Sequence, residues 1–344
     1  MKTIDTEAAV GAVLCHDLTR IVKDDVKETA FRKGHVVRPE DVQVLLSMGK
    51  DRLYVWDLGE DMAHENEAAE ALARICGGEA FAVSPIKEGK AVLTAARDGL
   101  FLVDLAKLEA VNGFDELSLA ARHSGFPVSR GQTAAGLKVV PLAVKKSLLA
   151  QVEELVAGGP LFDVAPYRPL KAGVVATGNE IFHGRIQDQF TPVVEDKLAE
   201  YGIRTVSKAV CDDNLGRIVA AIKDCLAQGL DLIVCTGGMS VDPDDLTPGA
   251  IKAAGAELVV YGAPVQPGAM FLAAYFGDVP ILGLPGCVMF GRRTIFDVVL
   301  PRIAAGRRLT RHELRGLGHG GLCLECRDCV FPICGFGRGF AYSL

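Results

Sequence analysis

The sequence is poor in aromatic residues and has no excess of basic charge. Phe, Tyr and Trp make up 6% of its 344 residues, and 37 Lys and Arg stand against 43 Asp and Glu, a net charge of −6. A protein that binds the phosphate backbone of nucleic acid gathers basic residues in one place and stacks bases on aromatic rings. No segment of the chain does so, and we expect no nucleic acid among its partners.

Long apolar runs are also absent. The longest, such as residues 269–276, stops well short of the roughly 20 residues that a membrane helix needs. Asp5 and Glu7 lie near the N-terminus, where a secretory signal would be apolar. We therefore expect a cytoplasmic protein that does not contact the membrane.

What the sequence does contain is enough apolar residues for more than one core. Hydrophobic residues make up 49% of the chain, and its length predicts two or three units. Breaks at 158–160 and 166–169 place the main boundary near residue 168. We expect a mixed α+β region at 1–168, an α/β domain at 169–308 and a short cysteine-rich tail at 309–344.

Strands and helices alternate in the second region at the rhythm of a mostly parallel sheet. We expect strands at 172–176, 204–209, 232–235 and 258–261, and helices at 192–201, 214–228 and 287–300. Gly277-Asp278 predicts a hairpin within this region. Asp98-Gly99 predicts another in the region before it, because Asp-Gly suits a tight turn. Open parallel sheets bind ligands beyond the carboxyl ends of their strands, which directs attention to three loops.

The first loop is Thr177-Gly178-Asn179-Glu180, and Asp188 follows it. A Thr-Gly turn exposes backbone N–H groups, and glycine lets a ligand approach closely because it has no Cβ. An ordinary strand-to-helix turn is the alternative explanation. The third loop consists of two segments, Pro267-Gly268 and Leu284-Pro285-Gly286. Taken alone, these segments too are explained as ordinary turns.

The second loop combines a glycine turn with acidic residues. It reads Thr236-Gly237-Gly238-Met239-Ser240, and Asp242, Asp244 and Asp245 precede the next helix. The glycines suit an anion such as phosphate, and the carboxylates suit a Mg²⁺ ion that holds the phosphate. Three acidic groups beside an anion would repel it without a metal. The alternative is a solvated loop whose carboxylates only favour the helix dipole.

In order and spacing, the three loops resemble the molybdopterin-binding domain shared by molybdenum insertases and molybdopterin adenylyltransferases. In that family Thr-Gly-x-Glu, Gly-Gly-x-Ser, an acidic residue before the next helix and Leu-Pro-Gly occur in this order. The resemblance covers Leu170 to about Arg308 and implies a three-layer αβα domain with a mostly parallel sheet. The N-terminal region is similar to insertases more distantly, through segments such as 11–14 and 33–34.

The resemblance also implies site residues. It makes Asp188 and Asp245 the catalytic carboxylates, and Asp242, Asp244 and Asp245 the ligands of Mg²⁺. The residues that would contact the pterin and its phosphate are Thr177, Gly178, Asn179, Glu180, Thr236, Gly237, Gly238, Met239, Ser240, Pro267, Gly268, Pro285 and Gly286.

The chain departs from the insertase pattern at three positions. Insertases usually carry Asp where this sequence has Asn179, Asn where it has Phe190, and Asn-Pro where it has Cys287-Val288. An amide in place of a carboxylate removes a negative charge and a metal ligand. Ligand binding can survive such a change while the activity is lost or altered.

These features lead to three hypotheses. The first is a molybdopterin-binding protein of molybdenum cofactor biosynthesis, a Mg²⁺-dependent insertase-like transferase acting on molybdopterin and molybdate. The second, favoured by the departures, is a non-catalytic cofactor carrier or a maturation partner of a client molybdoenzyme. The third is a Mg²⁺-dependent nucleotide pyrophosphatase, because Asp244-Asp245 is similar to the acidic loop of the competence-damage-inducible proteins. The resemblance further implies a homo-oligomer.

The tail contains four of the ten cysteines within twelve residues, in the spacing Cys-x₂-Cys-x₂-Cys-x₄-Cys. They are Cys323, Cys326, Cys329 and Cys334. Three cysteines at consecutive x₂ intervals are closer to a ferredoxin-type run than to structural zinc, which separates two pairs by a loop. An iron–sulfur cluster, a zinc ion and unmetallated redox thiols are the three interpretations.

Overall fold

The computed structural model describes residues 2–22, 26–55, 61–240, 242–243 and 245–341. Its contacts divide the chain into two compact units. Unit 1 comprises residues 1–97, 103–122 and 130–163, and unit 2 comprises residues 98–102, 123–129 and 164–344. The division into three domains stays a prediction. None of the described helices has both the length and the apolar character required to cross a lipid bilayer.

Unit 1 begins with two small antiparallel sheets. Their strands pair β1 with β4 and β2 with β3. A small core of Ala9, Leu14, Leu45 and Leu53 lies in this part of the unit. The elements are β1 (Lys2–Asp5), η1 (Thr6–Ala8), β2 (Leu18–Val22), β3 (Val26–Phe31), α1 (Asp41–Ser47) and β4 (Arg52–Val55).

The rest of unit 1 is a four-stranded antiparallel sheet, ordered β6-β7-β11-β9, with helix α2 packed on β7 and β11. Buried Ala69, Leu72 and Cys76 provide the apolar face of α2. A separate pair joins β5 to β12. The elements are β5 (Met62–His64), α2 (Glu65–Gly77), η2 (Gly78–Ala80), β6 (Phe81–Val83), β7 (Lys90–Ala95), α3 (Leu105–Asn112), β9 (Leu117–Ala121), β11 (Thr133–Val139), β12 (Ala143–Lys145) and α4 (Lys146–Leu155).

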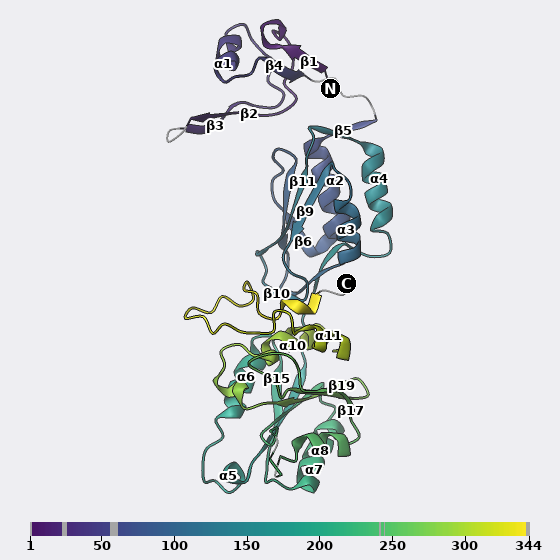
Figure 1. The fold of residues 1–344 in the computed structure, drawn as a ribbon. Helices are drawn as coiled ribbons and strands as arrows, with labels where there is room; N and C mark the ends of the chain where they lie inside the picture. The colour runs from purple at the N-terminus through teal and green to yellow at the C-terminus, as the bar shows by residue number, and fades with distance from the viewer. Residues whose placement is uncertain (1, 23–25, 56–60, 241, 244, 342–344) are drawn as a thin grey trace. The chain divides into compact units, whose positions relative to one another are not determined.

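Unit 2 is built on a six-stranded sheet of order β15-β14-β16-β19-β18-β17 (Figure 1). Strands β15, β14, β16 and β19 run parallel, and β18 and β17 continue the sheet antiparallel. The mostly parallel sheet is therefore confirmed, and so is the hairpin at Gly277-Asp278. The strands are β14 (Lys171–Thr177), β15 (Arg204–Cys211), β16 (Leu232–Thr236), β17 (Glu257–Tyr261), β18 (Leu272–Phe276) and β19 (Val279–Leu284).

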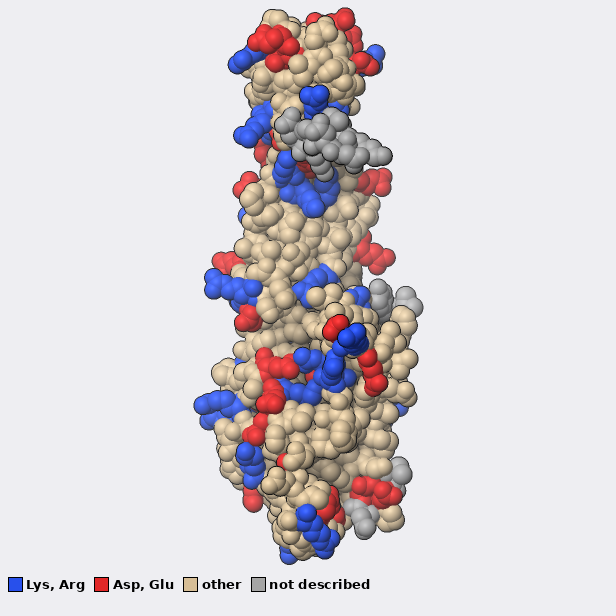
Figure 2. Space-filling model, turned by 90° about the vertical axis from the view of Figure 1, so that its left-hand side faces the viewer, with Lys and Arg blue, Asp and Glu red and all other residues tan. Residues whose placement is uncertain are grey.

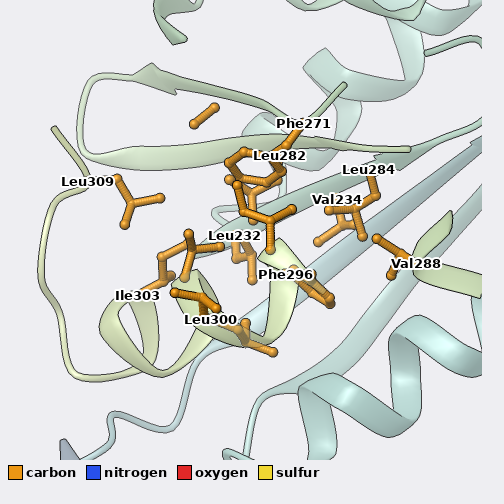
Figure 3. Close-up of a cluster of buried hydrophobic side chains, with 14 of the residues drawn as sticks. Leu232, Val234, Phe271, Leu282, Leu284, Val288, Phe296, Leu300, Ile303 and Leu309 are labelled. Carbon is orange, nitrogen blue, oxygen red and sulfur yellow. The ribbon is translucent and has the colours of Figure 1, made fainter. Parts of the chain in front are cut away.

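Helices cover both faces of this sheet and complete three layers. Successive residues of a strand point to opposite faces, so Val174 packs in the core beneath α6 and α10, and Val175 packs in the core beneath α7 and α8. Figure 3 shows part of the first core, where Val234 of the sheet and Phe296 of α10 lie together. The helices are α5 (Asn179–Phe182), α6 (Phe190–Ala199), α7 (Leu215–Ala227), α8 (Thr247–Ala253), α9 (Cys287–Phe290), α10 (Ile295–Ala304), α11 (Arg311–Gly316) and η3 (Arg338–Ala341).

The prediction of one helix over 287–300 is wrong, because α9 ends at Phe290 and α10 begins at Ile295. Thr294 starts the second helix: its Oγ1 accepts a hydrogen bond from the Phe296 N–H at 3.3 Å, and Asp297 accepts one from the Thr294 N–H at 2.7 Å. This reciprocal capping satisfies backbone groups at the start of a helix. The segment after Leu-Pro-Gly is therefore a short helix, a turn and a new helix.

The prediction of a hairpin at Asp98-Gly99 is also wrong. Strand β7 pairs with β6 and β11, whereas β8 (Gly99–Val103) belongs to a different sheet with β10 (Phe126–Val128) and β13 (Phe162–Ala165). A Cβ added to Gly99 would lie 2.3 Å from the Ala165 carbonyl oxygen. Glycine at this position therefore allows two backbones to approach closely rather than a tight turn.

A buried ion pair joins α6 to α10. The Lys197 ammonium lies 2.7 and 2.8 Å from the two carboxylate oxygens of Asp297, and the two side chains are 9% and 1% exposed. Lys197 also donates a hydrogen bond to the carbonyl oxygen of Arg292 at 3.1 Å, which fixes the turn between α9 and α10. At the surface, acidic and basic side chains are interspersed, as Figure 2 shows for one face.

Candidate functional site

The carboxyl ends of three parallel strands bring the predicted loops together. In the sheet register, Ala176 of β14 is paired with Thr236 of β16, and Thr236 is paired with Leu284 of β19. The loops that begin at Thr177, Gly237 and Pro285 therefore start side by side at one edge of the sheet. This is the edge at which open parallel sheets bind ligands.

Two threonine hydroxyls connect the first loop to the second. Thr177 Oγ1 donates a hydrogen bond to the carbonyl oxygen of Thr236 at 3.2 Å, and Thr247 Oγ1 donates one to the carbonyl oxygen of Gly237 at 2.8 Å. The two hydroxyl oxygens lie 3.2 Å apart, and both threonines are buried. These contacts fix the position of the glycine turn relative to the first strand.

Gly237 and Gly238 occupy positions that only glycine fits. Both have positive φ angles, +82° and +55°. A Cβ on Gly237 would lie 2.1 Å from the Thr177 carbonyl oxygen, and a Cβ on Gly238 would lie 2.9 Å from Thr247 Oγ1. The backbone of the turn therefore lies directly against the backbone of the first strand, with no space for a side chain between them.

The end of the second loop is held from both sides. Met239 is 4% exposed and belongs to the core on the α7 and α8 face, whereas the Ser240 side chain is exposed. The Tyr261 hydroxyl donates to the carbonyl oxygens of Met239 and Ser240, at 3.3 and 3.1 Å. Burial and the nearby Asp245 charge raise the pKa of Tyr261, which keeps this hydroxyl a neutral donor. Sequence patterns did not identify Tyr261, since it lies on a separate strand.

Asn179 makes a reciprocal contact with the loop after β15. Its N–H donates to Asp213 Oδ2 at 3.0 Å, and its side-chain oxygen accepts from the Asp213 N–H at 3.4 Å. An aspartate here would bring a second carboxylate into the site that holds the Asp213 carboxylate, and like charges in one site repel. Asp213 is thus a further residue of this edge that sequence patterns did not identify. Glu180, next in the first loop, is exposed.

The two predicted catalytic carboxylates each stabilise a different local structure, one a short turn and the other the start of α6. Asp245 Oδ2 accepts a hydrogen bond from the Asp242 N–H at 2.8 Å and closes a short turn. Asp188 Oδ1 accepts from the Phe190 and Thr191 N–H groups at 2.8 and 3.0 Å, and Oδ2 accepts from the Thr191 hydroxyl, so Asp188 caps α6. Asp244 lies outside the described residues.

The third loop packs against the start of α10. The carbonyl oxygen of Pro267 accepts a hydrogen bond from the Ile295 N–H at 3.1 Å. Gly268 has a φ of +133°, and a Cβ there would lie 2.4 Å from Ile295 Cγ2. Pro285 is buried and Gly286 is exposed. Of these four predicted contacts, only Gly286 lies fully at the surface.

Within the described ranges, no three His, Cys, Asp or Glu side chains lie around one point in an arrangement that could hold a single metal ion. Cys326 and Cys329 are exposed, and Cys323 and Cys334 are half-buried. The ten cysteines all lie in the described ranges, and no disulfide joins any two of them. The ligand roles of Asp242, Asp245 and the tail cysteines therefore stay predictions.

Two family models match parts of the chain. Residues 173–305 match one described as a probable molybdopterin binding domain, and residues 3–57 match one described as a domain of unknown function. A CinA-like protein of Mycobacterium sp. (strain MCS) is 37% identical over 91 residues, which are 26% of this chain and 22% of that protein. A CinA-like protein of Mycobacterium tuberculosis (strain H37Rv) is 37% identical over 91 residues and is covered to 21%. The match thus spans about a fifth of the length of these curated relatives.

Solved structures also show similarity. The molybdopterin biosynthesis enzyme MoaB of Thermus thermophilus is 21% identical, with a TM-score of 0.32, over 39% of this chain and 91% of that chain. The protein CinA of Thermoplasma acidophilum is 22% identical, with a TM-score of 0.34, over 39% of this chain and 97% of that chain.

Proposed function

Residues 173–305 are a domain of the molybdopterin-binding family, and on this premise we propose that the chain works in molybdenum cofactor biosynthesis. Its proposed activity is that of a Mg²⁺-dependent, insertase-like transferase with molybdopterin and molybdate as substrates. A homo-oligomer that delivers the cofactor to a client molybdoenzyme is part of the same proposal.

The Gly237-Gly238 turn is the observation that carries this proposal. It is locked at the carboxyl end of β16 by contacts with Thr177 and Thr247. Successive backbone N–H groups of a turn can form a concave site that binds anions. The pterin phosphate would bind at this turn, with Ser240 and Glu180 as the exposed side chains next to it.

The donor chemistry of the acidic turn fits Mg²⁺. Carboxylate oxygens are the ligands that this ion prefers, and Asp242 and Asp245 supply them from the two ends of one hydrogen-bonded turn. When bound, Mg²⁺ would neutralise phosphate charge next to the Gly-Gly turn. The chain's own contribution is to hold Asp245 in place and to orient the backbone donors. For Asp188 the contacts favour a capping role, and its catalytic role is the weaker part of the proposal.

A titration of the full-length protein with purified molybdopterin tests this function. We expect binding that Ser240→Ala weakens about tenfold, the loss of roughly one hydrogen bond to a charged group. Ser47→Ala, on the exposed face of α1, is the matched control and should bind like the native chain. No binding by the native chain would reject the proposal.

A second measurement distinguishes a transferase from a non-catalytic cofactor carrier. Addition of Mg²⁺, molybdate and adenylylated pterin should yield molybdenum cofactor, and Asp245→Asn should abolish that turnover. Pterin binding without turnover would support the non-catalytic carrier, which the Asn179 and Asp213 contact favours because the amide fits where a catalytic carboxylate would be repelled. Release of AMP from dinucleotides, without pterin binding, would identify a Mg²⁺-dependent nucleotide pyrophosphatase instead.

A further inference from the structure

The four tail cysteines lie on a closed loop rather than on a loose end. The Gly337 N–H donates a hydrogen bond to the carbonyl oxygen of Gly320 at 2.9 Å, so the two ends of the 320–337 segment meet. Phe336, near the second end, is 4% exposed and belongs to the core beneath α10. This segment, which we call the cysteine loop, is therefore folded onto unit 2 and packs against its core.

The cysteine loop is also tied to the third predicted site loop. The Gln266 N–H donates to the carbonyl oxygen of Gly321 at 2.8 Å, and the Cys323 N–H donates to the carbonyl oxygen of Gln266 at 2.8 Å. Gly321 is required at this junction, because a Cβ there would lie 2.4 Å from the Pro264 carbonyl oxygen. The first cysteine thus has a fixed backbone next to Pro267.

All four cysteines line one hollow. Its volume is about 210 Å³, and its other walls are mainly apolar side chains. That volume is several times the roughly 30 Å³ that one water occupies in the liquid. A single zinc ion with sulfur ligands at about 2.3 Å needs far less space. The other residues that line the hollow are Arg293, Gly320, Leu322, Leu324, Val330, Phe331, Gly335 and Phe336.

Positive charge lies next to this hollow. A second hollow, of about 290 Å³, is shared by Cys323, Cys326 and Cys329 with three arginines, Arg292, Arg293 and Arg327. Arg292 donates a hydrogen bond to the carbonyl oxygen of Arg327 at 2.7 Å, and the Arg293 guanidinium lies 5.4 Å from the centre of the Phe331 ring. These arginines would offset the negative charge that four thiolates bring to a metal centre.

We propose that Cys323, Cys326, Cys329 and Cys334 bind a [4Fe–4S] cluster in the hollow they line. Each thiol loses its proton on binding, and each thiolate ligates a different iron. The site therefore does not need three side chains around one ion, an arrangement that the described residues do not show. The apolar walls would cover one side of the cluster, the exposed Cys326 and Cys329 would leave another side open to solvent, and the arginines would balance its charge. The site adjoins Pro267 and the turn after α9, but it does not depend on pterin binding by the Gly-Gly turn.

Anaerobic reconstitution of the full-length chain with equal amounts of ferrous and ferric iron and with sulfide tests the proposal. We expect about four iron and four sulfide per chain, with broad visible absorption that bleaches on reduction. Cys326→Ser and Cys329→Ser, both at exposed positions, should lose most of the iron and retain the circular dichroism of the native chain. Cys287→Ser changes a half-buried cysteine outside the loop and is the matched control, which should keep the full cluster.

Other metal contents would overturn the assignment. One zinc per chain, lost in the same two variants, would make the loop a structural zinc site. Iron that persists in both variants would place the cluster elsewhere. A native chain that binds neither metal and whose four loop thiols all react with an alkylating reagent would leave a redox-thiol role. None of these results bears on molybdopterin binding, which the pterin titration measures separately.

Discussion

The Thr247 hydroxyl holds the glycine turn in place through one hydrogen bond. A substitution that removes this hydroxyl tests the contribution of that bond. Thr247→Val keeps the shape of the side chain but removes the hydrogen bond to the Gly237 carbonyl oxygen at 2.8 Å. We expect a loss of about 1–3 kcal/mol in the free energy of unfolding, because a buried acceptor loses its partner. Urea unfolding measures this change, and pterin binding should weaken with it.

Thr205 provides the matched control. Its hydroxyl oxygen is buried and makes no hydrogen bond within the described structure. Thr205→Val removes only an unsatisfied polar atom from β15, so the free energy of unfolding should stay constant or rise. A loss in Thr205→Val as large as the loss in Thr247→Val would show that the missing Thr247 hydrogen bond is not the cause of the destabilisation.

At this scale the sequence located the loops but not all of their functions. Gly237 and Gly238 were predicted because a glycine turn suits an anion, and the structure adds that the first strand already fills the space where the Cβ of Gly237 would lie. Met239 was predicted as a ligand contact, yet its side chain packs in the core. Tyr261 and Asp213 act through contacts that are distant in sequence, and no local pattern indicates them.

The Lys197–Asp297 ion pair joins two secondary-structure elements, α6 and α10. Lys197→Met leaves the buried Asp297 carboxylate without its ammonium partner, although Arg293 still contacts it at 2.9 Å. We expect a loss of about 3–5 kcal/mol in the free energy of unfolding, measured by urea denaturation. The exposed pair Lys208–Glu195 gives the control, since Lys208→Met should cost less than about 1 kcal/mol.

Helix α2 of unit 1 gives a pH-dependent prediction. His64 is fully buried, its Nδ1 accepts the Asn66 N–H at 3.2 Å, and its Nε2 donates to the Cys15 carbonyl oxygen at 2.5 Å. These bonds require the neutral ring, and burial lowers the pKa of His64 below its ordinary value of 6.5. The unfolded chain therefore binds the proton first, so this stability is complete above about pH 6.5 and declines as the pH falls.

Unfolding of the full chain at a series of pH values between about 5 and 8 measures this effect. His64→Gln should flatten the dependence of the unfolding free energy on pH, whatever its effect on absolute stability. His312→Gln, at an exposed position of α11, should leave the dependence unchanged. A native pH profile that His64→Gln does not alter would contradict the assignment.

The division of α9 from α10 shows which element boundaries a sequence can provide. Thr294 and Asp297 stand in the spacing of a capping box, and that signal was available before the structure. The prediction of one helix over 287–300 did not use this signal. The cap determines the boundary because it satisfies backbone donors that a continuous helix would have bonded internally.

At the scale of the molecule, unit 2 includes two segments that precede its sheet in the sequence. The Tyr167 hydroxyl donates to the Gly99 carbonyl oxygen at 3.0 Å, and the Phe126 ring lies 6.0 Å from the Phe331 ring. A fragment of residues 169–344 lacks β8, β10 and β13. We expect it to unfold at a lower temperature than the full chain, measured by circular dichroism. Equal transition temperatures would show that these strands do not stabilise the unit.

The same arrangement explains why the predicted hairpin failed. Local patterns give strong evidence for strands on both sides of Asp98-Gly99, and strands are present there. Which strands pair is decided by partners far away in the sequence, such as β10 and β13 for β8. The parallel sheet of unit 2 was predictable because alternation of strands and helices restricts its connections.

The hydrogen bond between Gly337 and Gly320 has a consequence for protein engineering. Because the two ends of the cysteine loop already touch, a short glycine bridge can replace the segment between them and still join the flanking chain. The replacement removes the core contacts of Phe336 and the hydrogen bonds to Gln266, and its unfolding temperature would measure what these contacts contribute. Such an excised protein, or a graft of the loop onto a relative that lacks it, would allow the molybdopterin-binding fold and the four cysteines to be studied separately.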